Sequence, residues 1–127
     1  MAGFNDGYTL EAASDGREFF APDIHGNPAV KMTIRHAESD VFRRVKAVEL
    51  ANLSGALAGV TDEIERARLV EESVIRSLSH LVCAWDLDDE CTQPAVHALL
   101  TARPYLVKWL DAQSVRSADF FGKASAS

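Results

Sequence analysis

The length, composition and charge of the chain exclude several classes of protein. It has 127 residues, of which 47% are hydrophobic and 25% charged, and this is the composition of one folded domain rather than of a disordered chain. A domain of about this length buries roughly two-thirds of its unfolded surface, so it can fold without a metal or a disulfide. The net charge is -6 and the 13 basic residues are scattered, whereas nucleic-acid binding needs clustered Lys and Arg. We therefore expect no nucleic-acid partner.

No segment has the character of a targeting or membrane-spanning sequence. The stretch MAGFNDGYTLEAASDG at the N-terminus lacks both a basic start and an apolar run of signal-peptide length. No apolar run anywhere approaches the roughly 18 residues of a membrane helix. The sequence therefore indicates a cytoplasmic protein with no membrane partner, in which the two cysteines remain thiols.

The first part of the chain predicts a β-hairpin. Residues 1–16 are rich in Gly, Ala, Asp and Ser, which is typical of a flexible N-terminal arm or an edge strand. Further on, Val30, Met32 and Ile34 alternate with polar residues, as in a half-buried strand. The HGNP stretch at residues 25–28 favours a turn, because Gly and Asn tolerate positive φ and Pro cannot continue a ladder. We expect an antiparallel strand on each side of this turn.

A first helix is predicted after the hairpin. Ser39 is expected to be its N-cap, since a hydroxyl oxygen there can accept a free backbone N–H. A break is expected within residues 54–60, where two glycines each cost the helix about 1 kcal/mol relative to Ala. The apolar residues of this helix form one stripe and a second stripe beside it: Val41, Val45 and Val48, then Leu50, Leu53 and Leu57.

The next helix has the strongest periodicity in the chain. Thr61 is expected to cap it, and the acidic residues that follow suit the positive end of the helix dipole. The spacing predicts one continuous helix that ends at Trp85, with its apolar stripe facing the core. That stripe consists of Ala67, Val70, Val74, Leu78, Leu81 and Trp85.

Two shorter helices are predicted to complete the fold. Thr92 can cap the first of them, with Pro94 in its first turn. Pro104 ends this helix and starts the last one, because the residue before a proline is pushed out of helical geometry. The expected fold class is α+β and predominantly α-helical, with an N-terminal β-hairpin followed by about four helices. It forms a single domain over residues 17–121, followed by a flexible C-terminal tail over residues 122–127.

Both cysteines and two of the four histidines lie in the stretch HLVCAWDLDDECTQPAVH, residues 80–97. Structural zinc sites bring in their ligands as closely spaced pairs, whereas Cys91 is too far along the chain from Cys83. The acidic DLDDE run lacks the Gly and Glu that a calcium loop needs, and no local motif supports a cysteine nucleophile. We therefore predict no catalytic, cofactor-binding or metal-binding residues, and interpret the stretch as a joint between two helices. Its zinc-ligand types are His80, Cys83, Cys91 and His97.

Aromatic and basic side chains are the candidates for contact with a partner protein. Trp85 and Trp109 lie on apolar helical stripes and are interpreted first as core residues. Phe120 and Phe121 lie beyond the last predicted helix, where core packing and partner contact are equally supported. The predicted partner-binding residues are Phe120, Phe121, Tyr105, Trp109, Arg43 and Arg44.

The order of short motifs over about residues 28–121 resembles that of the tail assembly chaperones of long-tailed, siphovirus-type bacteriophages. These proteins share a strand followed by Ser-Asp and an Arg-bearing helix, a Trp before an acidic or Gly-bearing turn, a Thr- or Ser-started helix with leucines, a Pro that starts the last helix, and a terminal Phe. The acidic turn CAWDLDDECT departs from the family because it lacks the Gly often present there. The matching residues are Ser39, Asp40, Phe42, Arg43, Arg44, Trp85, Asp86, Asp88, Thr92, Leu99, Leu100, Pro104 and Phe120.

The resemblance implies a non-enzymatic function. Such chaperones bind the tape measure protein, recruit tail tube subunits, self-associate around the tape measure, and leave before the virion is complete. The protein would then act in the host cytoplasm and be absent from the mature virion. Many of these chaperones are made in two lengths by a programmed ribosomal frameshift, and Gly122-Lys123 matches the position of the slippery run.

Three alternatives belong to other classes of protein. A small head-tail or capsid accessory protein of a phage would share the size and acidity but would stay in the virion. An acidic inhibitor that mimics nucleic acid would need dense carboxylates along one face, and here arginines are interspersed with them. An enzyme is the class that the residues support least.

Overall fold

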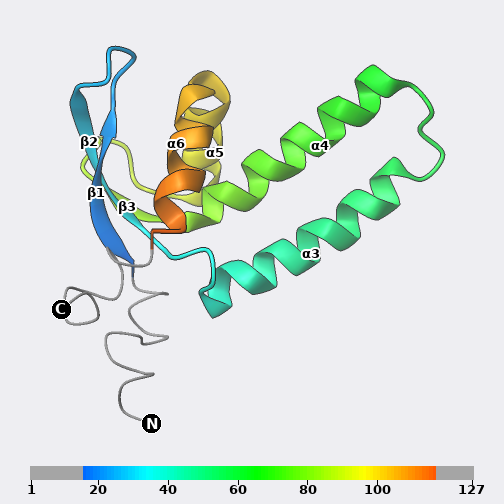
Figure 1. The fold of residues 1–127 in the computed structure, drawn as a ribbon, viewed down its shortest axis with the longest axis horizontal. Coiled ribbons are helices and arrows are strands. Elements are labelled where there is room, and N and C mark those ends of the chain that lie inside the picture. The colour runs from blue at the N-terminus through cyan, green and yellow to red at the C-terminus, as the bar shows by residue number, and fades with distance from the viewer. Residues whose placement is uncertain (1–15, 117–127) are drawn as a thin grey trace, which may run out of the picture.

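In this computed structural model of the chain, the structure describes residues 16–116. The predicted N-terminal arm, apart from Gly16, lies outside the described residues, as do Phe120, Phe121 and the predicted tail at 122–127. Within residues 16–116, a three-stranded antiparallel sheet and four α-helices confirm the predicted α+β, predominantly helical class (Figure 1). In chain order the elements are β1 (Arg17–Pro22), β2 (Pro28–Ile34), α3 (Asp40–Leu57), α4 (Glu63–Leu78), the 3-10 helix η1 (Ser79–Leu81), β3 (Val82–Trp85), α5 (Gln93–Ala102) and α6 (Tyr105–Ser114).

β1 and β2 form the predicted antiparallel hairpin. In its turn, the carboxylate of Asp23 accepts hydrogen bonds from the backbone N–H groups of His25 and Asn27, at 2.9 and 3.0 Å. Gly26 has a φ of +86°, which glycine adopts without the steric penalty of a Cβ. The turn is therefore organised by one aspartate and one glycine, both local to the sequence.

A third strand, β3, shows that the prediction of one continuous helix ending at Trp85 was wrong. α4 ends at Leu78, and the chain then passes through η1 into β3, which pairs antiparallel with β2. Trp85 lies opposite Met32, and its indole N–H donates to the backbone C=O of Asp89 at 2.7 Å. The strand forms because the backbone groups along the second edge of β2 need hydrogen-bond partners. These partners come from a distant part of the chain, so local periodicity could not predict them.

Two predicted N-caps are confirmed. The hydroxyl of Ser39 accepts the N–H of Phe42 at 3.2 Å at the start of α3. The hydroxyl of Thr92 accepts the N–H of Ala95 at 3.2 Å at the start of α5. Pro94 occupies the first turn of α5, where a missing N–H does no harm. Each cap satisfies a backbone donor that the helix itself cannot.

The prediction that Thr61 caps the next helix was wrong by one residue. The side chain of Asp62 is the cap of α4, and it accepts the N–H of Glu65 at 3.2 Å. The break before it falls within the predicted segment, but α3 continues through Gly55 to Leu57. A carboxylate at this position also suits the positive end of the helix dipole.

The core lies where the sheet meets the helices. α6 lies against β1 and β2, and α5 packs on η1, which also contacts the bases of α3 and α4 (Figure 1). Tyr105, Trp109 and Trp85 are partly buried and pack against this core, consistent with the core interpretation of the two tryptophans. The largest fully buried side chains are Ile34, Leu81, Leu100, Leu110 and Val96.

The segment after β2 ties the sheet to η1 and α6. The backbone N–H of Arg35 donates to the C=O of Leu81 at 2.7 Å, and its guanidinium donates to the C=O of His80 at 2.7 Å. Two residues later, the N–H of Ala37 donates to the C=O of Ser114 at 2.8 Å. The segment that follows β2 is therefore held to both η1 and α6.

His36 in this segment makes the stability depend on pH. It is 4% exposed, and its Nδ1 accepts the backbone N–H of Glu38 at 2.9 Å. Burial lowers the pKa of His36, and also that of His80, below the ordinary value of 6.5. At pH values between the lowered pKa and 6.5 the unfolded chain binds more protons than the folded one. The contribution of these histidines to stability is therefore fully present above pH 6.5 and is lost as the pH falls below it.

We therefore expect the melting temperature to be lower at pH 5.5 than at pH 7.5. His36→Asn keeps an acceptor for the Glu38 N–H, because the Asn side-chain oxygen can replace Nδ1, but it has no titratable ring. The variant should lose part of this pH dependence, and His80 should account for a remainder. Thermal melts followed by circular dichroism at both pH values measure this. An unchanged difference in the variant would show that His36 contributes nothing.

Candidate functional site

α3 and α4 form a helical arm, defined by these two helices and the connection between them. Figure 1 shows that they run side by side and extend away from the sheet and from α5 and α6. Phe42 is the one buried residue of α3. Over much of the arm, α3 and α4 therefore cover only each other. The arm presents side chains that the rest of the described molecule does not cover.

A groove lies between the arm and α6. Its volume is about 550 Å³, and its walls come from α3, α4 and α6. Single exposed apolar side chains are normal at protein surfaces, but a contiguous group of them indicates an interaction site. Four large aliphatic side chains that line the groove are exposed: Leu50 at 58%, Val70 at 41%, Val74 at 45% and Val115 at 57%.

An ion pair joins the two helical walls of the groove. Arg76 of α4 donates through Nε to both carboxylate oxygens of Glu49 of α3, at 3.1 and 3.2 Å. The hydroxyl of Ser73 lies 3.4 Å from the same carboxylate. The Glu49 side chain is only 14% exposed, so its charge is partly removed from water and depends on these donors. The pair therefore sets how α3 and α4 face each other along the groove.

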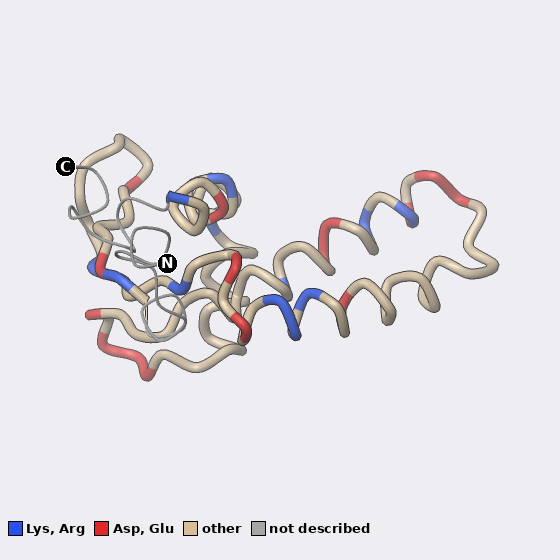
Figure 2. The backbone as a smooth tube through the Cα atoms, turned by 60° about the horizontal axis from the view of Figure 1, so that its bottom comes forward, with Lys and Arg blue, Asp and Glu red and all other residues tan. Residues whose placement is uncertain are grey.

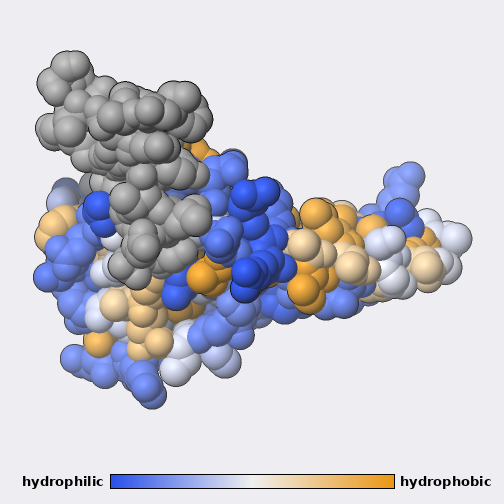
Figure 3. All heavy atoms as spheres, turned by 90° about the horizontal axis from the view of Figure 1, so that it is seen from below, coloured by the Kyte–Doolittle hydropathy of each residue, from blue (hydrophilic) through white to orange (hydrophobic). Residues whose placement is uncertain are grey.

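Charged residues of both signs occur along the arm (Figure 2). The tip carries Asp62, Glu63 and Glu65 at the start of α4, where carboxylates are favoured by the helix dipole. The base of α3 carries Arg43 and Arg44, both exposed. Seen from below, the arm also shows hydrophobic surface between hydrophilic groups (Figure 3). Arg66 also lies near the tip and donates through Nη1 to the C=O groups of Leu57 and Val60, so both signs of charge occur there.

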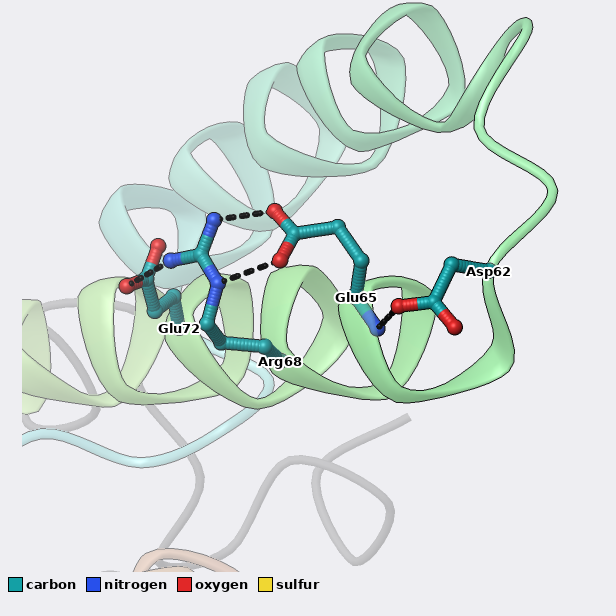
Figure 4. A network of polar contacts seen from close by, with 4 residues as sticks. All are labelled: Asp62, Glu65, Arg68 and Glu72. Atoms are coloured by element: carbon teal, nitrogen blue, oxygen red, sulfur yellow. Dashed lines mark hydrogen bonds and ion pairs between the residues drawn. The ribbon is translucent and has the colours of Figure 1, made fainter.

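Arg68 is held between two carboxylates of its own helix (Figure 4). Its Nε donates to Glu65 at 3.0 Å and its Nη1 to Glu72 at 2.6 Å, with a further hydrogen bond from Nη2 to Glu65. Hydrogen bonding from Arg68 lowers the pKa of Glu65, and the same contact raises the pKa of Arg68. Because these side chains are exposed, the network shapes the outer surface of α4 and contributes little to stability.

The predicted partner-binding residues within the described chain do not line the groove. Arg43 and Arg44 are exposed in the first turns of α3, outside it. Trp109 and Tyr105 lie half-buried on α6 against the core. Tyr105 also lines a second cavity of about 480 Å³ between the hairpin turn and the joint of α5 and α6. Partner binding by these four residues stays a prediction.

The residues that do line the groove correct part of the sequence interpretation. Val70 and Val74 lie on the stripe that was predicted to face the core, and both are exposed. The stripe extends beyond the body of the molecule, so its middle section has no core to face. Leu50 lies on the second of the two stripes of α3. α3 and α4 carry more apolar surface than they need to pack against each other. This excess is the sequence signal that could have identified the groove.

The four residues of zinc-ligand type in the 80–97 stretch lie on different elements: His80 in η1, Cys83 in β3, Cys91 in the acidic turn and His97 in α5. Within residues 16–116, no three His, Cys, Asp or Glu side chains are grouped so that they could hold a metal ion. Cys83 and Cys91 form no disulfide, and the Cys83 thiol donates to the backbone C=O of Leu81 at 3.9 Å. Burial, and then the neighbouring Cys83, raise the pKa of Cys91. A raised pKa keeps this thiol protonated at neutral pH, the opposite of what a nucleophilic cysteine needs.

Comparisons of the chain with protein-family models, with curated proteins and with solved structures find no match. Across the described helices, none has the length and apolar character needed to cross a bilayer. The resemblance to tail assembly chaperones therefore rests on the sequence motifs. The arm and its groove are the structural features from which a function can be argued.

Proposed function

We propose that the protein is a non-enzymatic tail assembly chaperone of a long-tailed bacteriophage. In this role it binds the tape measure protein, recruits tail tube subunits in the host cytoplasm, self-associates during assembly, and is absent from the mature virion. The observation that carries the proposal is the apolar groove beside the arm, since exposed clusters of aliphatic side chains are typical of protein-binding surfaces. The motif order over about residues 28–121 is what points to this family.

The chemistry of the groove favours an amphipathic helix of the partner. Its lining is largely aliphatic and also includes charged residues of both signs: Glu38, Lys46, Glu49, Lys108 and Asp111. A helix that lays its apolar face into such a groove can place charged residues of either sign against these side chains. The groove thus suits a helical segment and not a small polar ligand.

The proposal is tested by co-expression with the neighbouring tape measure and tail tube proteins, followed by pull-down. Leu50→Asp is expected to weaken the complex at least tenfold, about 1.4 kcal/mol, because it places a carboxylate among the aliphatic walls of the groove. Dissociation constants from titration calorimetry of the purified proteins measure the loss. The absence of any complex with either protein would leave the proposal without support.

Val48→Asp is the matched control. Val48 is 60% exposed against 58% for Leu50 and belongs to the same helix, but it does not line the groove. It should bind as tightly as the unchanged protein, and both variants should keep the same melting temperature. Equal losses from the two variants would argue against the groove. Mass spectrometry of purified virions provides a second test, because detecting the protein there would favour a head-tail or capsid accessory protein.

A further inference from the structure

The groove lies directly beside the point where the described part of the chain ends. Val115 follows α6 and is itself one of the exposed side chains that line the groove. Arg116 is the last described residue, and only residues 117–119 separate it from Phe120. An extended chain spans at most about 3.6 Å per residue, so Phe120 can lie anywhere within about 14 Å of Arg116. The groove begins inside that radius.

The chain within that distance carries large apolar side chains that suit an uncovered aliphatic groove. Phe120 and Phe121 are adjacent large aromatics, and the groove presents aliphatic side chains without a cover among the described residues. A volume of about 550 Å³ is within the range that encloses drug-sized molecules. Asp119 and Lys123 flank the aromatic pair, matching a groove lining that carries both signs of charge.

A short connection also gives this segment an advantage over any other occupant. A ligand joined by a short linker is present at an effective concentration in the millimolar range, and the entropy lost on closing a loop grows only slowly with its length. A separate molecule would have to bind well enough to overcome this local excess. We therefore propose that the segment carrying Phe120 and Phe121 fills the groove of its own chain in the free protein.

The proposed segment acts as an internal occupant that a partner must displace. Replacing both phenylalanines by alanine would then tighten partner binding rather than weaken it. The inference is independent of the partner's identity, because it concerns the free protein. It would hold for a chaperone and for an accessory protein alike, and its test contains no other phage component.

Methyl NMR of the full chain tests the proposal. Aromatic rings in the groove shift the methyl resonances of the side chains around them, so the double variant F120A/F121A should move the resonances of Leu50 and Val74. The methyl groups of Val48, on the same arm but outside the groove, are the internal control and should not move. Groove resonances that stay in place, or that move no more than those of Val48, would overturn the proposal.

Two further measurements make each outcome decisive. F120L/F121L keeps the apolar bulk but removes the rings, so it should produce the resonance changes even where the alanine variant fails to fold. Tenfold dilution should leave the spectrum of the unchanged protein as it is, because the contact lies within one chain. Groove resonances that change on dilution would show that a second copy fills the groove, and this would overturn the intramolecular arrangement.

Discussion

Leu81→Ala is expected to lower the free energy of unfolding by about 2–5 kcal/mol. The Leu81 side chain is fully buried in η1, the short helix on which α3, α4 and α5 converge. Alanine would remove its buried atoms and leave a cavity that neighbours on several elements cannot close together. Since domains of this kind are stable by about 5–15 kcal/mol, the change should lower the midpoint of urea unfolding substantially.

Leu87→Ala is the control for this prediction. Leu87 lies in the acidic turn after β3 and is 39% exposed, so the same chemical change should cost less than about 1 kcal/mol there. Both variants are compared with the unchanged protein by urea unfolding at pH 7.5. A Leu81→Ala variant as stable as Leu87→Ala would contradict the position of η1 at the centre of the core.

Gly16→Ala is expected to destabilise the protein by about 2–4 kcal/mol. Gly16 has a φ of +89°, where a side chain costs about 1 kcal/mol. A Cβ there would also lie 2.7 Å from the backbone oxygen and 2.9 Å from the carbonyl carbon of Ile34. Overpacking of this kind costs typically about 1–3 kcal/mol. Because Ile34 belongs to the central strand and is fully buried, the clash cannot be relieved by moving a flexible side chain.

Gly26→Ala separates the two contributions to this cost. Gly26 has a similar φ of +86°, but a Cβ there would meet no atom within 4 Å. Its replacement should therefore cost only about 1 kcal/mol, the backbone contribution alone. Thermal unfolding of the two variants gives the difference directly. Equal destabilisation would mean that the strand next to Gly16 can shift to make room.

Local features of this chain were predicted well because their causes lie within a few residues. The hydroxyls of Ser39 and Thr92 each cap a helix by accepting the N–H group of the residue three positions further along the chain. The HGNP turn depends on its own glycine and on Asp23 close before it. In each case a donor and an acceptor are brought together by short-range backbone geometry, so the sequence pattern was sufficient.

The end of α4 was predicted wrongly because a distant strand competes with the helix. The apolar spacing through Leu81 and Trp85 is compatible with a helix, and local propensity does not exclude one. β2 decides the matter, since Met32 and Thr33 pair with Trp85 and Ala84 and give that segment backbone partners as a strand. Helix periodicity contains no information about such a partner.

The sequence by itself determined the fold class, the hairpin turn, two helix caps and the absence of a zinc-like spacing of ligands. Only the tertiary structure decided which residues of the apolar stripes on α3 and α4 face the core and which line the groove. Their residues have the pattern of a core-facing surface whether or not a core lies opposite. The arm extends beyond the sheet and α6 (Figure 1), so Leu50 and Val74 line a groove instead. Burial depends on what lies across from a helix face, and residue spacing along one helix cannot specify this.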